Sequence, residues 1–198
     1  MTRRIYEERG RWHLTVPPAI LVPMEGRSMP APVIETDRLT LRPLRASDAG
    51  LITLYAGDAR VAKMTTRIPH PFPPGAAESF IGRALRDDGG ETIWALDAGK
   101  IDGGEMLGAI SVRDSGEVGY WIGPPFWRTG YAREALAAVI AHHFATGGGR
   151  LRAQVFQDND ASAAVLTATG FRYVGEGEAF SVARGGVQPV WKYELPPA

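Results

Sequence analysis

The sequence contains no cysteine among its 198 residues. Without cysteine there are no disulfide bonds, no thiolate nucleophile and none of the usual structural zinc sites. Covalent catalysis through a cysteine is therefore excluded. Nothing in the composition indicates a secreted protein.

An excess of charge of either sign is also missing. The 22 basic and 22 acidic side chains give a formal net charge of zero. Because no overall field attracts a polyanion, we expect neither nucleic acid nor an anionic membrane as a partner. A negatively charged ligand has to be bound at a local site.

The first thirty residues lack a long apolar run. Arg3 and Arg4 are followed by polar residues where a signal peptide needs an apolar segment. The apolar run at 19–22 is short and flanked by prolines. We therefore expect a soluble, cytoplasmic protein.

Length and proline content divide the chain into two parts. A length of 198 residues fits one globular domain. Residues 1–32 carry five prolines and little periodicity, which is typical of an extension that is either mobile or laid over a domain. The prediction is a proline-rich N-terminal extension at 1–32 and one folded domain at 33–198.

Hydrophobic periodicity from residue 33 onward indicates a mixed α/β fold. The predicted strands are 39–42, 92–96, 106–113, 117–122, 151–156, 171–174 and 187–195. The predicted helices are 47–55, 76–86, 129–146 and 159–169. The proline-rich segment 65–75 is expected to be a loop, and residues 102–104 a tight turn. Because helix 129–146 connects strands 117–122 and 151–156, we expect these two strands to be parallel.

The segment from residue 117 to 135 is a predicted strand, loop and helix that suits an anionic ligand. Gly130 and Ala132 are small, so backbone N–H groups at the helix start can approach an anion, and Arg128 and Arg133 add positive charge. A diphosphate fits such a site. A turn glycine beside solvated arginines explains the same residues. The segment is neither a P-loop nor a dinucleotide-binding fingerprint.

Three segments together resemble a known family. Residues 117–124, Glu-Val-Gly-Tyr-Trp-Ile-Gly-Pro, and 127–135, Trp-Arg-Thr-Gly-Tyr-Ala-Arg-Glu-Ala, resemble the acetyl-CoA-binding motif of the GNAT superfamily. The resemblance is to the branch of RimJ/RimL-type ribosomal-protein N-terminal acetyltransferases. Segments 34–48 and 159–171 resemble the same branch, in the right order, so the match spans about residues 33–195.

The resemblance implies a fold and a cofactor site. The implied fold is the mixed α+β GNAT fold: a central, mostly antiparallel, twisted sheet with helices on both faces and a splayed parallel strand pair that holds acetyl-CoA. Gly119 is the expected place of a β-bulge. The implied cofactor-binding residues are Trp121 and Ile122 for pantetheine, Asn159 on the cofactor side, and Arg128, Thr129, Gly130, Tyr131, Ala132 and Arg133 for the pyrophosphate.

Two residues are implied to take part in the chemistry. Glu117 stands where this family often has a glutamate that acts as general base, directly or through water. Ser162 matches a position whose hydroxyl can donate to the cofactor sulfur. A solvated strand-end role for Glu117 and a helix-capping role for Asn159, with Ser162 in the first turn, are the structural alternatives. Leu166 stands where some relatives have a tyrosine acid.

Histidines and aromatic residues outside these motifs receive no catalytic role. His142 and His143 are adjacent on one helix, about 100° apart around its axis, so they do not converge on a metal, and no metal cofactor is expected. The residues that face an acceptor in this prediction are Met64, Arg67, His70 and Phe72. Trp94 is expected in the core.

The predicted function is an N-acetyltransferase that moves an acetyl group directly from acetyl-CoA to a primary amine in a ternary complex. The acceptor is a protein N-terminal amine, an aminoglycoside, or a small amine or amino acid. The alternative is a non-catalytic acyl-CoA-binding module of the same fold that senses acyl-CoA or regulates a partner. The protein is expected to be a monomer or a homodimer.

Overall fold

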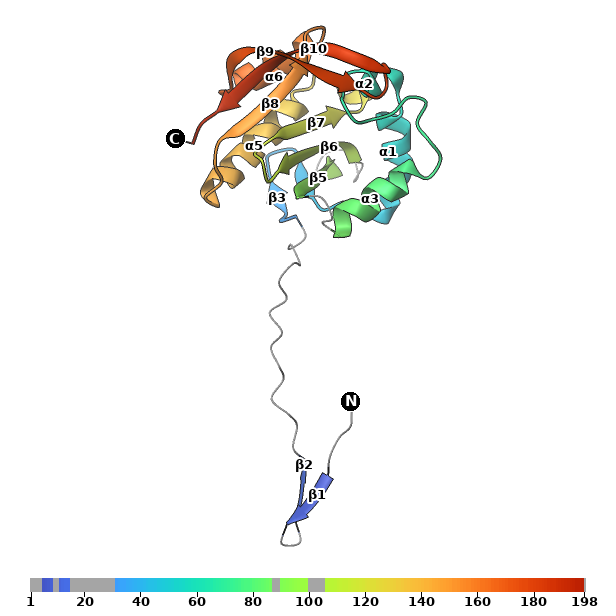
Figure 1. The fold of residues 1–198 in the computed structure, drawn as a ribbon, viewed down its shortest axis with the longest axis vertical. Helices are drawn as coiled ribbons and strands as arrows, with labels where there is room; N and C mark the ends of the chain where they lie inside the picture. The colour runs from blue at the N-terminus through green and yellow to red at the C-terminus, as the bar shows by residue number, and fades with distance from the viewer. Residues whose placement is uncertain (1–4, 9–10, 15–30, 87–89, 100–105, 198) are drawn as a thin grey trace.

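The computed structural model describes residues 5–8, 11–14, 31–86, 90–99 and 106–197 (Figure 1). The predicted turn at 102–104 and the arginines at positions 3 and 4 lie outside the described residues. Within 1–32, strands β1 (Ile5–Glu8) and β2 (Arg11–Leu14) form an antiparallel pair. Residues 1–32 show little hydrophobic periodicity, so this hairpin was not among the predicted elements.

Two antiparallel sheets form the centre of the domain. The first has the order β3-β4-β5-β6-β7, with β3 at Ile34–Glu35, β4 at Thr40–Arg42, β5 at Glu91–Asp97, β6 at Met106–Arg113 and β7 at Val118–Ile122. The second has the order β8-β10-β9, with β8 at Leu151–Phe156, β9 at Arg172–Ser181 and β10 at Gly186–Leu195.

The two sheets meet at a parallel junction. Glu117 and Arg152 form an isolated parallel bridge, and the Arg152 N–H donates to the Gly116 carbonyl at 2.8 Å. No further pairing between β7 and β8 follows within the described residues. The predicted splayed parallel pair is therefore confirmed, with its closed end at Glu117.

Helices cover both faces of the sheets. They are η1 (Ala46–Asp48), α1 (Ala49–Ala56), α2 (Ala59–Ala62), α3 (Ala76–Arg86), η2 (Pro124–Phe126), α5 (Tyr131–Ala145) and α6 (Asp160–Ala168). Helix α5 buries Leu136 and Val139 in one core cluster, whereas α1 and α3 bury Ile52 and Ile81 in another (Figure 1). Burial of these apolar stripes fixes the helices on opposite sides of the strands.

The predicted mixed α/β class and the splayed strand pair are confirmed, and the differences are local. Strand β9 is longer than the predicted 171–174. Its later residues are rich in glycine and glutamate, which have low strand propensity, but pairing with β10 keeps them in an extended conformation. The short helix η2 lies in a segment predicted as a loop, and α2 lies between the predicted helix 47–55 and the predicted loop 65–75, where no element was predicted. Neither is long enough to give a periodic signal.

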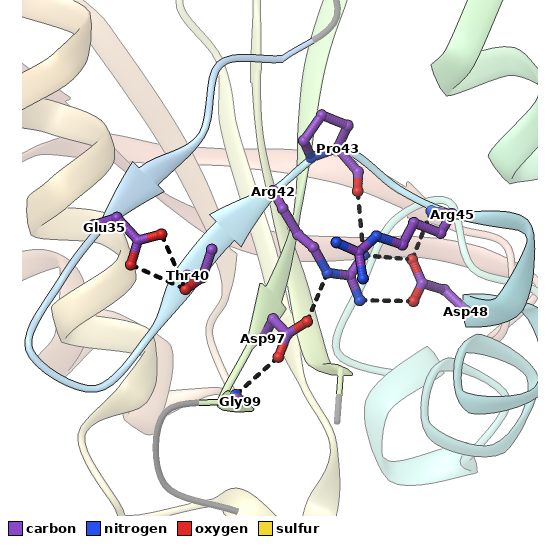
Figure 2. Close-up of polar contacts among 8 residues, drawn as sticks. All are labelled: Glu35, Thr40, Arg42, Pro43, Arg45, Asp48, Asp97 and Gly99. Carbon is purple, nitrogen blue, oxygen red and sulfur yellow. Dashed lines mark hydrogen bonds and ion pairs between the residues drawn. The ribbon is translucent and has the colours of Figure 1, made fainter. Parts of the chain in front are cut away.

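A buried ion network ties the first strands to the first helical turn (Figure 2). Arg42 donates to the Asp97 carboxylate from Nε at 2.6 Å and to both Asp48 oxygens at 2.9 Å. Asp48 also accepts the Arg45 N–H, and Asp97 accepts the Gly99 N–H. Burial opposes ionisation of Asp97, but the Arg42 and Gly99 hydrogen bonds outweigh it and lower the pKa of Asp97.

Replacing Arg42 with methionine should destabilise the domain strongly. The change leaves two carboxylates without their cation, a loss of about 3–5 kcal/mol in the free energy of unfolding for such buried pairs. The pKa of Asp97 is lowered in the folded state. Its contribution to the free energy of unfolding is therefore fully present above its unfolded-state pKa and is lost as the pH falls through its folded-state pKa.

Urea denaturation at neutral pH measures this loss. The matched control is Arg150→Met, which removes an exposed pair with Glu194, and it should cost no more than about 1 kcal/mol. Equal losses in the two variants would contradict the assignment of the Arg42 network to stability.

Candidate active site

One cavity of about 1610 Å³ runs along the splayed strands. Its walls come from β5, β6, β7 and β8, the loop before α5, the starts of α5 and α6, and the segment from α1 to α3. The lining includes every predicted site residue: Glu117, Trp121, Ile122, Arg128, Thr129, Gly130, Tyr131, Ala132, Arg133, Asn159 and Ser162. The fold thus brings together residues that lie up to 45 positions apart in the sequence.

The start of α5 has the geometry of an anion-binding site. Gly130 is the N-cap residue with φ 86°, and no side chain caps the helix. Gly130 adopts the left-handed conformation that favours glycine, so the chain turns sharply and the first N–H groups of the helix face the cavity end. Arg128 and Arg133 line the same end. This donor set fits the diphosphate of acetyl-CoA.

Arg38, from the turn between β3 and β4, holds this loop in place. Its guanidinium donates to the Thr129 carbonyl at 3.0 Å and to the Glu134 carboxylate at 2.6 Å. Glu134 also accepts from the Thr36 hydroxyl. Burial opposes ionisation of Glu134, but the Thr36 and Arg38 hydrogen bonds lower its pKa. The sequence analysis missed Arg38, although it lies in the segment 34–48 that resembles the family.

The start of α6 combines capping with a tyrosine contact. The Asn159 side chain accepts the Ser162 N–H at 3.2 Å, so the capping interpretation of Asn159 is confirmed. The Ser162 hydroxyl lies 2.8 Å from the Tyr120 hydroxyl, which β7 presents. Burial raises the pKa of Tyr120 to about 12, so this phenol is protonated at neutral pH. Leu166, where a tyrosine acid was considered, is buried in the core.

Glu117 lies at the closed end of the strand pair and lines the cavity. Its side chain is 39% exposed, and its contacts are long: Gln154 Nε2 at 3.4 Å and Arg113 Nη1 at 3.6 Å. The carboxylate is therefore directed at the cavity without a short hydrogen bond. This geometry is compatible with a base that receives a proton from a bound amine.

The family model for the "Acetyltransferase (GNAT) domain" matches residues 38–172. The chain belongs to the GNAT acetyltransferase family. This GNAT protein is 31% identical over 152 residues, 73% of its length, to an uncharacterized N-acetyltransferase, YoaA, from Bacillus subtilis, of which 85% is covered.

Solved acetyltransferase structures have the same fold as this GNAT protein. The microcin C7 self-immunity acetyltransferase MccE, in complex with acetyl-CoA and AMP, superposes with a TM-score of 0.70 at 18% identity, over 81% of this chain and 93% of that one. RimL, a ribosomal L7/L12 α-N-protein acetyltransferase in complex with coenzyme A, superposes with a TM-score of 0.71 at 19% identity, over 83% and 98%.

The expected β-bulge at Gly119 is wrong for this GNAT protein. Pairing between β6 and β7 runs without a register shift from Gly108 opposite Ile122 to Val112 opposite Val118. A Cβ at Gly119 would meet only the Ser111 hydroxyl, at 3.7 Å. The tight turn at Gly116, with φ 82°, connects the strands, so no extra residue has to be absorbed within β7. The glycine instead leaves a flat, open spot on the cavity wall.

The residues expected near the acceptor divide into two groups. Met64, Arg67 and Phe72 line the cavity. His70 does not: its ring lies 3.1 Å from the Gly57 carbonyl, on the surface. Trp94 is 3% exposed, as expected for a core residue.

The two histidines of α5 have structural contacts. His142 packs edge-on against Trp94, and the His143 ring lies 2.9 Å from the Gly149 carbonyl. Among the described residues, no group of three histidine, cysteine or acidic side chains is placed to hold a metal ion. None of the helices in that part of the chain is both long and apolar enough to cross a membrane.

Proposed function

We propose that this GNAT protein transfers an acetyl group directly from acetyl-CoA to a primary amine within a ternary complex. The acceptor is a small-molecule amine or a protein N-terminal amine. The observation that carries the proposal is that one and the same cavity is lined both by the anion-binding start of α5 and by Glu117. Cofactor and acceptor can therefore occupy it together.

The chain's own residues account for cofactor binding. The N–H groups from Arg128 to Arg133 and the two arginine side chains bind the diphosphate. Strand β7 is the edge of its sheet beyond Glu117, so backbone groups near Trp121 and Ile122 can pair with the extended pantetheine arm. The Ile122 carbonyl also accepts a hydrogen bond from the Trp127 indole at 2.7 Å. The complexes of MccE with acetyl-CoA and of RimL with coenzyme A support this assignment.

Acetyl-CoA supplies a thioester whose carbonyl carbon accepts the amine. Glu117, directly or through a water molecule, takes the proton that the amine must lose before its nitrogen bonds to that carbon. The C–S bond breaks, and the sulfur receives a hydrogen bond from the Ser162 hydroxyl, whose partner Tyr120 lies 2.8 Å away. The nitrogen loses its second proton to the departing thiolate, so the products are an N-acetylated amine and the free thiol of coenzyme A, and Glu117 returns its proton to solvent.

The division of the chain at Val33 belongs to the same proposal. All residues assigned to the cofactor and to the chemistry lie after this position, and among the described residues the cavity lining begins at Ile52. The domain at 33–198 therefore carries the proposed activity.

Release of free thiol from acetyl-CoA tests the proposed function. The purified protein should release thiol only when an amine acceptor is present, in a screen of peptides with free N-termini, aminoglycosides, and small amines and amino acids. Release of one equivalent without an acceptor would indicate an acetylated enzyme and overturn direct transfer. Tight acetyl-CoA binding with no turnover on any acceptor would support the non-catalytic alternative.

A further inference from the structure

Three charged residues form a row across the cavity wall. Glu91 on β5 pairs in register with Arg113 at the end of β6, and the Arg113 N–H donates to the Glu117 carbonyl at 2.9 Å. All three side chains line the cavity. The next row on the same face, Ser111 opposite Gly119, is the open spot described above. The charged row therefore lies beside Gly119, the one glycine of β7.

The carboxylate of Glu91 is hydrogen-bonded by neighbouring side chains and has a structural role in the cavity wall. Its carboxylate accepts two hydrogen bonds from Arg67, at 2.6 and 2.8 Å, and one from the Ser111 hydroxyl at 2.6 Å. Burial opposes its ionisation, but these hydrogen bonds lower the pKa of Glu91. Glu91 thereby anchors the loop that carries Arg67, and three of the acceptor positions of its carboxylate are occupied.

Arg113 and Glu117 are not satisfied in this way. The Arg113 guanidinium lies 3.8 Å from Glu91 and 3.6 Å from Glu117, and these are the longest ion pairs among the described residues. Both distances exceed that of a hydrogen bond. The two side chains are 37% and 39% exposed. A guanidinium and a carboxylate thus stand side by side in the cavity, each with donor or acceptor positions open to a ligand.

This pair of opposite charges is complementary to a zwitterion. We infer that the acceptor is a free α-amino acid, whose amino group binds at Glu117 and whose carboxylate binds at Arg113. The inference rests on the proposed function, because Glu117 is there the residue that receives the amine proton. Arginine binds carboxylates with two parallel hydrogen bonds, which orients the amine as well as binding it.

The remaining walls favour an apolar side chain on that amino acid. The cavity lining also includes Ile68, Phe72, Phe80 and Ile93, and Ile93 pairs in register with Ser111 in the row next to the charged one. Lys63 and Arg83 add positive charge to the lining and oppose a polyamine. A peptide N-terminus brings a neutral carbonyl where the carboxylate of an amino acid meets Arg113. Leucine, methionine and phenylalanine therefore fit better than spermidine or a peptide.

A matched acceptor series on the unmodified protein tests the inference. Phenylalanine, phenylalaninamide and phenethylamine share one side chain and differ in the group beside the amine. We expect kcat/KM for phenylalanine to exceed that of both others by at least about tenfold, as for one charge-assisted hydrogen bond or more. The amino group of phenylalaninamide is less basic than that of phenylalanine, so a larger fraction of it is deprotonated and reactive at neutral pH. A preference for phenylalanine therefore arises from binding and not from the reactivity of the amine.

Variants locate the preference. Arg113→Gln should raise the KM for phenylalanine at least about tenfold and bring its kcat/KM toward that of phenethylamine, while Arg113→Lys should keep part of the preference. The matched control is Arg150→Gln. That guanidinium pairs with Glu194 and does not line the cavity, so the control should retain the full preference.

The outcomes separate this inference from the proposed function. Acetylation of the amide, the amine or a peptide as efficiently as the free amino acid would overturn the inference and leave the acetyltransferase proposal standing. An unchanged preference in Arg113→Gln would overturn the assignment to Arg113. Coenzyme A binding without acetylation of any acceptor would overturn both.

Discussion

Replacement of Glu117 by glutamine should lower kcat at neutral pH by about 10²- to 10⁴-fold, the usual contribution of general-base assistance. The amide keeps the shape of the side chain but cannot accept the proton of the amine. The KM for acetyl-CoA should stay close to that of the wild type, because the diphosphate-binding residues are at the other end of the cavity.

The pH profile distinguishes a base from a mere contact. Raising the pH should partly restore the rate of Glu117→Gln, because a larger fraction of the acceptor amine is then already deprotonated. The control variant Glu194→Gln changes a carboxylate that pairs with Arg150 and Arg152 outside the cavity, and it should leave the rate unaltered. Identical pH profiles for wild type and Glu117→Gln would assign the base to another group, such as a water held by backbone carbonyls.

The same variant separates the two charge-based roles of Glu117. If the carboxylate only holds the acceptor's ammonium group next to Arg113, its loss raises the acceptor KM and leaves kcat nearly intact. If it also removes the proton, kcat falls at saturating acceptor. Measuring both constants with one amino acid therefore tests the mechanism independently of acceptor binding.

Local sequence motifs predicted the strand, loop and helix that form the cofactor end of the cavity. The run from Glu117 to Arg133 contains its own turn signals, because Gly130 has to take a positive φ at the helix start. The parallel strand pair followed from the long helix between 117–122 and 151–156. These features depend on neighbours in sequence, which is why periodicity and glycine positions were sufficient.

Contacts between distant segments were beyond that reasoning. The Arg38–Glu134 pair joins residues 96 positions apart, and the Tyr120–Ser162 contact spans 42. Arg113 lies beside Glu117 across the tight turn at Gly116, but only the register of β5 and β6 brings Glu91 into the same row. No single stretch of sequence contains such contacts between distant segments.

The error at Gly119 has a physical explanation. A glycine within a strand signals either a bulge or a place where another group approaches closely. Here the register is unbroken, which excludes a bulge in the strand pairing, and the missing side chain leaves the cavity wall open at this point. Sequence alone does not separate the two, because both require the same residue.

Replacement of Gly130 by aspartate should abolish measurable binding of acetyl-CoA, a loss of more than about 100-fold in affinity. The new carboxylate would stand at the helix start where N–H groups face the diphosphate, so it repels the ligand and competes for the same donors. A side chain at φ 86° is also strained, and its Cβ would lie 3.4 Å from the Arg38 guanidinium.

A control for the backbone strain of the Gly130 variant is available at the other end of α5. Gly147 follows α5 with φ 82° and open space around its Cβ position, so Gly147→Asp introduces the same residue with the same backbone strain far from the cavity. Calorimetry should find wild-type affinity for acetyl-CoA in Gly147→Asp and none in Gly130→Asp. Acetyl-pantetheine, which lacks the diphosphate, should be used equally by both variants. Undiminished acetyl-CoA affinity in Gly130→Asp would move the diphosphate site away from the start of α5.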